Sequence, residues 1–108
     1  MRSAISLLGL GVKAGRVAIG VDAARAALQK GKAEMIVLSQ DAGDRANEKL
    51  VVLAGHKKVP VFYGPDAERL GSALGRPPVH GVAVLDRQLA RGLRTYLAAE
   101  AAGESHAG

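Results

Sequence analysis

The spacing of apolar residues along the chain alternates between a helical period and short continuous runs that are typical of strands. Ile5, Leu8 and Val12 recur at helical spacing before Gly15, which predicts a helix over 3–13 that ends at this glycine. Apolar runs bounded by glycine, proline or polar residues predict four strands, over 17–19, 34–38, 59–63 and 79–85. The remaining segments predict helices over 23–30, 45–55, 67–74 and 87–99. This alternation predicts one α/β domain with a sheet between helical layers.

An aspartate stands immediately before each of the last four predicted helices: Asp22, Asp44, Asp66 and Asp86. A carboxylate in this position accepts hydrogen bonds from the free amides of the first turn, so helix capping accounts for these acids without catalysis. Gly31 is the predicted stop of the helix after Asp22. The small and polar residues 102–108 predict a disordered tail after a single domain over 1–101.

The composition limits the class of protein. The 108 residues suffice for one hydrophobic core, and 48% hydrophobic residues are too many for a disordered chain. Without cysteine the chain has no disulfide, no thiolate metal ligand and no cysteine nucleophile. Its apolar runs are too short for a membrane span, and it opens without a signal-peptide pattern. We therefore expect a cytoplasmic protein that does not contact a membrane.

No catalytic motif is present. The histidines His56, His80 and His106 are isolated and match no metal-ligand spacing. The glycine-rich segment 9–15 follows a predicted helix rather than a strand and lacks the Lys-Ser/Thr pair of a phosphate-binding loop. We therefore predict that the chain is not an enzyme and uses no metal or cofactor.

The net charge of +5 is concentrated at the start of the chain, because residues 1–32 hold six basic side chains and one acid. A basic segment on an otherwise neutral chain indicates a polyanion partner, since cations that neutralise phosphates release condensed counterions. The alternative is a solvated surface that only keeps the protein soluble.

Two loops offer groups that suit a nucleic acid. In the turn 20–23 a strand meets a helix, and free amides there form a general anion site at the positive end of the helix dipole. Lys13, Arg16 and Arg25 lie near this turn in the sequence. The loop 76–80 is stiffened by two prolines and offers a cation and an apolar contact. If both loops lie at one end of the sheet, they can clamp bent RNA; otherwise they only cap a helix and shape a turn.

Longer segments resemble those of a known family. They are Gly20, Gly31-Lys32-Ala33, Met35-Ile36-Val37-Leu38, Asp41-Ala42, Val59-Pro60-Val61, 70–75 and 82–86. Over about residues 3–97 the chain resembles the kink-turn RNA-binding ribosomal protein superfamily, which includes the large-subunit proteins L-seven-Ae and L-thirty-e. The segments 7–10 and 13–17 are most similar to its short bacterial members of the YlxQ type. The resemblance implies a three-layer α/β/α sandwich around a mixed four-stranded sheet, and cytoplasmic RNA binding without catalysis.

The resemblance also implies where RNA is contacted. After the glycine equivalent to Gly20, kink-turn binders carry Asn, Glu and Lys residues that touch RNA, and these positions here hold Asp22, Ala23 and Ala26. A carboxylate cannot donate to a base and repels phosphate, and methyl groups make neither contact. Arg25 replaces the charge of the missing lysine but not its geometry.

We therefore predict binding of structured RNA, a kink-turn or ribosomal RNA, with altered specificity and with protein partners in a ribonucleoprotein. The family's base-covering loop corresponds to 75–81. The predicted RNA-binding residues are Lys13, Arg16, Gly20, Val21, Asp22, Ala23, Arg25, Arg76, Pro77 and Val79. The alternative is a protein-interaction module on the same fold that has lost RNA binding and exposes a continuous apolar patch.

Overall fold

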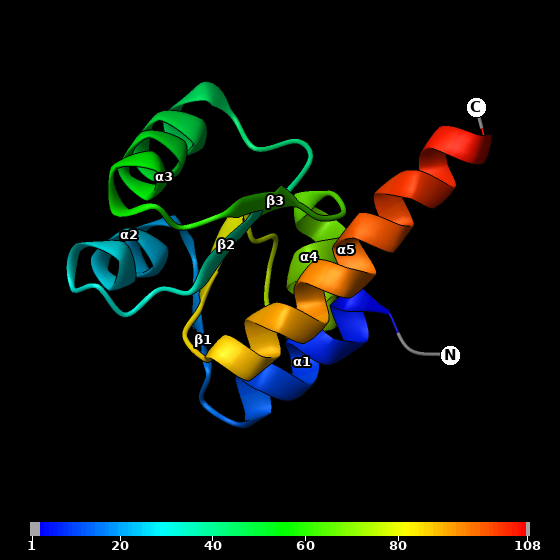
Figure 1. The fold of residues 1–108 in the computed structure, drawn as a ribbon, viewed down its shortest axis with the longest axis horizontal. Helices are drawn as coiled ribbons and strands as arrows, with labels where there is room; N and C mark the ends of the chain where they lie inside the picture. Colours follow the sequence, from blue (N-terminus) through cyan, green and yellow to red (C-terminus); the bar gives the residue numbers. More distant parts are fainter. Residues whose placement is uncertain (1–2, 108) are drawn as a thin grey trace.

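The fold follows the predicted alternation of helices and strands (Figure 1). The computed structural model describes residues 3–107, and for 101–107 it describes the backbone alone. The elements are α1 (Ala4–Lys13), β1 (Val17–Ile19), α2 (Val21–Gln29), β2 (Met35–Leu38), α3 (Asp44–Lys57), β3 (Val61–Tyr63), α4 (Ala67–Ala73), β4 (Gly81–Val84) and α5 (Arg87–Ala107). The predicted α/β architecture around a mixed four-stranded sheet is confirmed.

The strand order is β1-β4-β2-β3, with β4 antiparallel to both of its neighbours and β2 parallel to β3. β1, β2 and β3 therefore run in the same direction. Their carboxyl ends, at Ile19, Leu38 and Tyr63, lie at the same end of the sheet as Gly81, where β4 begins. We call this the loop end and the opposite end the base. Four connections meet at the loop end: β1–α2, β2–α3, β3–α4 and α4–β4.

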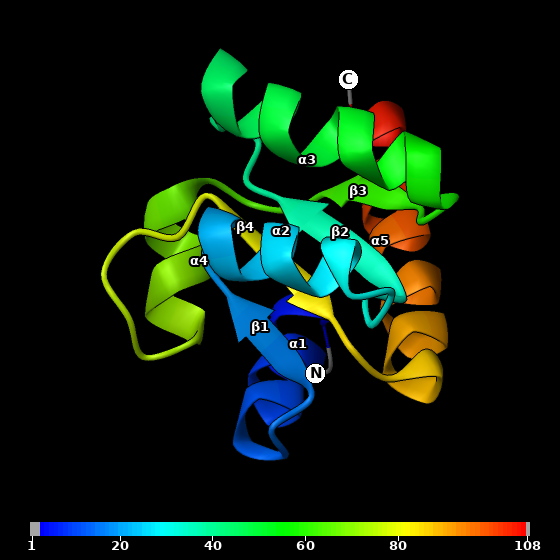
Figure 2. The same cartoon turned by 90° about the vertical axis from the view of Figure 1, so that its left-hand side faces the viewer.

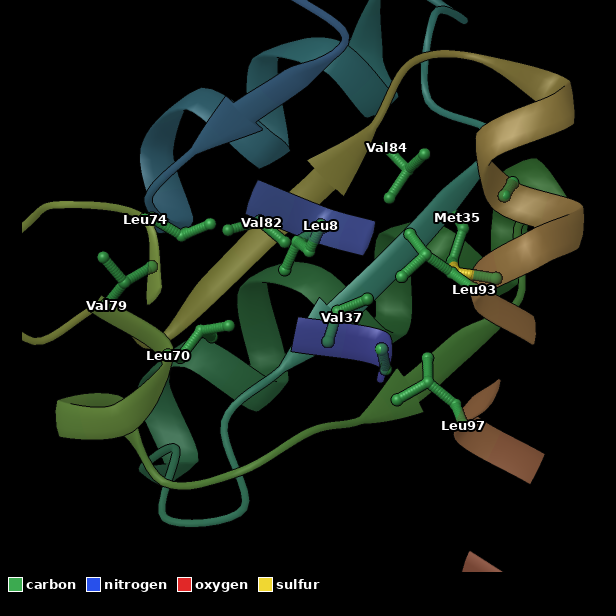
Figure 3. Close-up of a cluster of buried hydrophobic side chains, with 12 residues drawn as sticks. Leu8, Met35, Val37, Leu70, Leu74, Val79, Val82, Val84, Leu93 and Leu97 are labelled. Carbon is green, nitrogen blue, oxygen red and sulfur yellow. The ribbon is translucent and has the colours of Figure 1, made fainter. Parts of the chain in front are cut away.

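Two helical layers cover the sheet because successive strand residues point to opposite faces. Met35 and Val37 pack against α1, α4 and α5, whereas Ile36 and Leu38 pack against α2 and α3. Figure 3 shows the first of these two cores, whose buried members are Ala4, Leu8, Met35, Val37, Leu70, Leu74, Val79, Val82, Val84, Ala90, Leu93 and Leu97. The second core is rich in alanine on α2, which lets this helix lie close to the sheet and to α3.

Two of the four predicted aspartate caps are present. The carboxylate of Asp66 accepts from the amide of Arg69 at 2.8 Å, and that of Asp86 accepts from the amide of Leu89 at 2.8 Å. The other two predictions were wrong, because α2 and α3 are preceded by glycine N-caps at Gly20 and Gly43 and no side chain caps them. Asp22 and Asp44 instead lie in the first turns of α2 and α3, where a negative charge interacts favourably with the helix dipole.

Element boundaries differ most at the end of the chain. The last helix was predicted to stop near residue 99, but α5 continues to Ala107 and includes most of the segment expected to be a disordered tail. Alanine, the residue with the highest helix propensity, stands at 102 and 107 in this segment and at 101 just before it, which favours the longer helix. Gly108 lies outside the described residues, and both the domain boundary at 101 and the disorder of 102–108 stay predictions. Among the described residues, no helix is long and apolar enough to cross a membrane.

Gly71 marks the closest approach between α4 and the loop before β4. A Cβ atom here would overlap the carbonyl oxygen of Pro77 and lie 2.9 Å from that of Arg76. We expect Gly71→Ala to lower the free energy of unfolding by about 1–3 kcal/mol, because backbone rather than a side-chain tip must move. Urea unfolding followed by circular dichroism measures this change.

Gly55→Ala is the matched control, since Gly55 lies inside α3 with open space around it. There alanine restricts the unfolded chain and improves helix propensity, which should raise the free energy of unfolding by about 0.5–1 kcal/mol. Equal effects of the two substitutions would contradict the close approach at Gly71.

Candidate functional site

The turn between β1 and α2 is fixed to the start of β4. The amide of Gly20 donates to the carbonyl of Gly81 at 2.9 Å, while the carbonyl of Gly20 accepts the first α2 hydrogen bond from Ala24 at 2.9 Å. Gly20 has a φ of 103°, a conformation that a side chain would strain. The amides of residues 21–23 precede the first hydrogen-bonded turn of α2 and have no partner within the helix. The turn thus presents free amides at a positive helix end, a geometry that suits an anion.

The loop between α4 and β4 is anchored at both of its ends. The amide of Arg76 donates to Gly71 at 2.8 Å, and the amide of Val79 donates to Ala67 at 2.9 Å. The carbonyl of His80 accepts from Ser39 at the end of β2 at 2.9 Å. This loop and the Gly20 turn therefore meet at the loop end, which is the arrangement that the RNA-clamp hypothesis requires (Figure 2).

Not every predicted residue of the second loop is available to a ligand. Arg76 and Pro77 are exposed, but Val79 is only 7% exposed and belongs to the core between the sheet and α4. The expectation that Val79 contacts RNA was wrong, because its side chain is buried in the core and anchors the loop there. Residue type alone did not distinguish a ligand-facing valine from a buried one, since a valine after two prolines occurs at both kinds of position.

The cations predicted around the Gly20 turn separate in space. Arg16 precedes β1, at the base, where its guanidinium lies 3.3 Å from the carboxylate of Asp86. Lys13 is in the last turn of α1, also at the base. Only Arg25, exposed on α2, lies on the element that starts at Gly20. Grouping Lys13 and Arg16 with the turn was therefore wrong, because the length of β1 separates them from it.

Other side chains take their place beside the turn. A shallow cleft of about 630 Å³ at the loop end is lined by Val21, Asp22, Asp41, Gly43, Arg45, Ala46, Lys49 and His80. The ammonium of Lys49 lies 3.6 Å from the carboxylate of Asp22, whose side chain is 93% exposed. Arg45 and Lys49 come from the first turns of α3, which packs beside α2. The sequence reasoning missed both residues. A usable signal was present: α3 follows β2 as α2 follows β1, so the first turns of both helices lie at the same end of the sheet.

The charge at the loop end is close to balanced. Its four connections and the first six residues of α2, α3 and α4 contain five cations and six acids. The cations are Arg25, Arg45, Lys49, Arg69 and Arg76. The acids are Asp22, Asp41, Asp44, Glu48, Asp66 and Glu68. The cationic excess of the first third of the chain is thus not gathered at the predicted clamp.

Asp41 ties two of the loops together. Its carboxylate accepts from the amide of Ala67, the first residue of α4, at 2.8 Å. This hydrogen bond is the main reason that the pKa of Asp41 is lowered from its ordinary value of 3.8. Desolvation opposes it, and the Ser39 hydroxyl and His80 lower the pKa further. Ser39 is fully buried, with its hydroxyl 3.5 Å from Nδ1 of His80. A buried hydroxyl cannot reach a substrate carbonyl, so this Ser-His-Asp grouping is structural.

The described residues contain no group of three or more His, Asp or Glu side chains that could hold a metal ion. His56 and His80 are exposed single side chains, and His106 lies outside the part whose side chains are described. That the chain is not an enzyme and uses no cofactor stays a prediction.

Comparison with known proteins places this geometry in a family. Residues 3–97 match the model of the ribosomal protein L7Ae/L30e/S12e/Gadd45 family. The chain belongs to this family. The family resemblance expected from the sequence is therefore confirmed over the range predicted, while the YlxQ-type subgroup stays a prediction.

Solved structures agree with the family assignment. A Bacillus halodurans protein of unknown function is 30% identical, with a TM-score of 0.83, and the match covers 87% of this chain and 95% of that one. A Giardia lamblia 15.5kD RNA binding protein is 19% identical, with a TM-score of 0.71, and the match covers 87% of this chain and 81% of that one. At this lower identity the second likeness shows the shared fold.

The Asp41–Ala67 hydrogen bond predicts a pH-dependent stability. A carboxylate with a lowered pKa stabilises the folded state above its unfolded-state pKa, and this contribution disappears as the pH falls through the folded-state pKa. We expect Asp41→Ala to unfold at a lower urea concentration than the wild type at pH 7, and the difference to narrow once the pH falls below 3.8.

The matched control is Asp44→Ala, whose carboxylate caps no helix amide. Its effect on the urea midpoint should be smaller at pH 7. A difference between wild type and Asp41→Ala that stays constant from neutral to acidic pH would contradict this role for Asp41.

Proposed function

We propose that this chain is a non-catalytic RNA-binding protein whose loop end holds a bend in a structured RNA, either a kink-turn or a segment of ribosomal RNA. The observation that carries the proposal is the Gly20–Gly81 hydrogen bond, which brings the anion-binding turn beside the proline-stiffened loop. Family membership supports it, and so does the shared fold of a Giardia protein described as RNA binding. Cytoplasmic location and assembly into a ribonucleoprotein belong to the same proposal.

The two loops take different parts of the RNA. The free amides at the start of α2 suit a phosphate, because they donate hydrogen bonds at the positive end of a helix dipole. Arg76 and Pro77 present a guanidinium plane and a rigid apolar ring, which suit the faces of unstacked bases. Lys49 and Arg45 line the cleft beside the Gly20 turn and add cations that can contact the RNA phosphates.

Specificity is altered because three positions implied by the resemblance lack their usual chemistry. Asp22 presents an exposed carboxylate where the family carries an amide side chain. Its ion pair with Lys49 also reduces the positive charge that Lys49 can offer to RNA. Ala23 and Ala26 make no polar contact. Each lost base contact costs roughly 1–3 kcal/mol of discrimination, so a standard kink-turn should be held weakly.

The alternative of a protein-interaction module is not favoured by the apolar surface. The exposed large hydrophobic side chains among the described residues are Leu10, Val51, Val52 and Tyr63. Leu10 lies on α1 and the two valines lie on α3, helices that cover opposite faces of the sheet. These side chains therefore do not form one continuous patch.

Restoring the three positions should restore kink-turn binding. We expect Asp22→Asn, Ala23→Glu and Ala26→Lys together to tighten the Kd for a kink-turn RNA by about tenfold or more, since two base contacts and a phosphate contact are regained. Fluorescence anisotropy with a labelled kink-turn RNA measures the change.

The control for net charge is Glu68→Gln, which also adds one positive charge at the loop end without supplying a contact. If the triple variant binds no tighter than this control, the Gly20 turn does not lie against the RNA in the proposed way.

RNA binding should depend steeply on salt. The logarithm of the association constant should fall linearly with the logarithm of salt concentration, by about 0.7–0.9 per phosphate contacted. The measurement is an anisotropy titration at several concentrations between about 50 and 200 mM salt. An affinity that hardly changes over this range would rule out a largely electrostatic interaction.

A further inference from the structure

The base of the molecule carries the positive charge that the loop end lacks. The connections at the base, with the helix residues next to them, contain eight cations: Lys13, Arg16, Lys30, Lys32, Lys57, Lys58, Arg87 and Arg91. They contain two acids, Glu34 and Asp86, which leaves an excess of six positive charges. Figure 2 shows the carboxyl ends of α2 and α3 and the start of α5 along one side of the molecule, away from the loop before β4. The chain is therefore an electrical dipole whose positive end is the base.

We propose that the base is a second RNA-contacting surface, which binds the phosphate backbone of a segment different from the one at the loop end. This inference rests on the proposed function and adds a second, electrostatic contact to it. The molecule measures 37 × 29 × 26 Å, so one folded RNA of modest size can reach both ends. The loop end then supplies shape recognition and the base supplies most of the affinity.

The central residues of this surface, which we call the basal patch, are Lys13, Arg16, Lys32, Arg87 and Arg91. Two ion pairs lie among them. Arg16 lies 3.3 Å from Asp86, and Arg87 lies 3.4 Å from Glu34. The two acids hold the arginines in place while leaving their side chains 53% and 81% exposed. Within the described part of the chain, Lys13, Lys32 and Arg91 have no acidic partner within salt-bridge distance.

Helix stabilisation accounts for some of these cations but not for all. Lys13 and Lys57 lie in last turns, where a positive charge is favoured by the helix dipole. Arg87 and Arg91 lie at the opposite kind of position, in the first turns of α5, and that first turn has no acidic residue. A cation at a helix N-terminus opposes the dipole. The helix dipole thus does not account for Arg87, and Arg91, in the second turn, lies beyond its main effect. A polyanion would give both arginines a partner.

The chemistry of the patch favours RNA over an anionic membrane. Three of its five cations are arginines, whose planar forks bind phosphate oxygens in pairs. Stable membrane binding also needs apolar side chains that insert between lipids. Of the exposed large hydrophobic residues among those described, Leu10, Val51 and Val52 are on helices that end at the base, and only Leu10 lies in the last turn of its helix.

The test compares two sets of substitutions that remove the same charge. Lys13→Ala, Lys32→Ala and Arg91→Ala remove three unpaired cations from the basal patch. Arg25→Ala, Arg45→Ala and Arg76→Ala remove three cations from the loop end. The probes are two labelled RNAs, a minimal kink-turn and the same kink-turn with a long helical stem, each titrated at several salt concentrations.

For the wild type we expect the longer stem to tighten binding. The basal triple should abolish this gain and lower the salt slope by about 2–3, at 0.7–0.9 for each lost phosphate contact. The loop-end triple should lower the affinity for both RNAs but still bind the RNA with the long stem more tightly than the minimal kink-turn. A basal triple that retains the gain and the slope of the wild type would overturn the proposal.

Cross-linking gives an independent readout of position, because the natural chain has no cysteine. Gln88→Cys at the base and Ala23→Cys at the loop end, both at exposed positions, are coupled to a photoreactive group. Cross-links from both sites to different segments of the long RNA support the inference. Cross-links from Ala23→Cys alone overturn it and leave the proposed function intact.

Two further outcomes separate the possible failures. Absence of binding to either RNA at low salt would overturn the proposed function itself and this inference with it. Binding of vesicles that contain phosphatidylserine, lost in the basal triple while RNA binding is unchanged, would assign the base to a membrane and overturn the inference alone. Circular dichroism of both triples verifies that each is folded before comparison.

Discussion

The hydrogen bond between Gly20 and Gly81 is the contact on which the site depends, because it fixes two loops that are far apart in the sequence. It exists only because β4 runs antiparallel between β1 and β2, which brings the start of β4 next to the end of β1. It also requires the positive φ of Gly20, which turns the chain from β1 into α2 within one residue. Strand order and one glycine together position the two loops.

Much of the fold could be predicted from the sequence, since hydrophobic periodicity reports which face of each element is buried. The run 35–38 is apolar throughout because its strand is covered on both faces, as predicted. The order of the strands could not be read from periodicity, and only the family resemblance supplied a mixed sheet. Caps at Asp22 and Asp44 were misplaced because glycine begins both helices, and the position of an acid alone does not separate a cap from a first-turn residue.

The candidate site was harder to predict, because function depends on neighbours in space rather than in sequence. The sequence left open whether the two loops are neighbours, which they are. Lys13 and Arg16 are at the far end of β1 from Gly20, and Lys49 reaches the turn from α3. Helix dipoles account for much of this separation: α2, α3 and α4 begin at the loop end with acids, while α1, α2 and α3 end at or near the base with lysines. In this sandwich, where most helices point one way, the positive charge therefore gathers at one end, while the other end is close to balanced.

The Asp41 carboxylate has a consequence for the cost of binding. It is supplied by the β2–α3 connection yet satisfies the first amide of α4, so the two connections are held in one arrangement before any ligand arrives. A partner that docks against either connection therefore loses little conformational entropy in ordering the other. Rigidity acquired during folding thus lowers the entropic cost of docking without any additional contact.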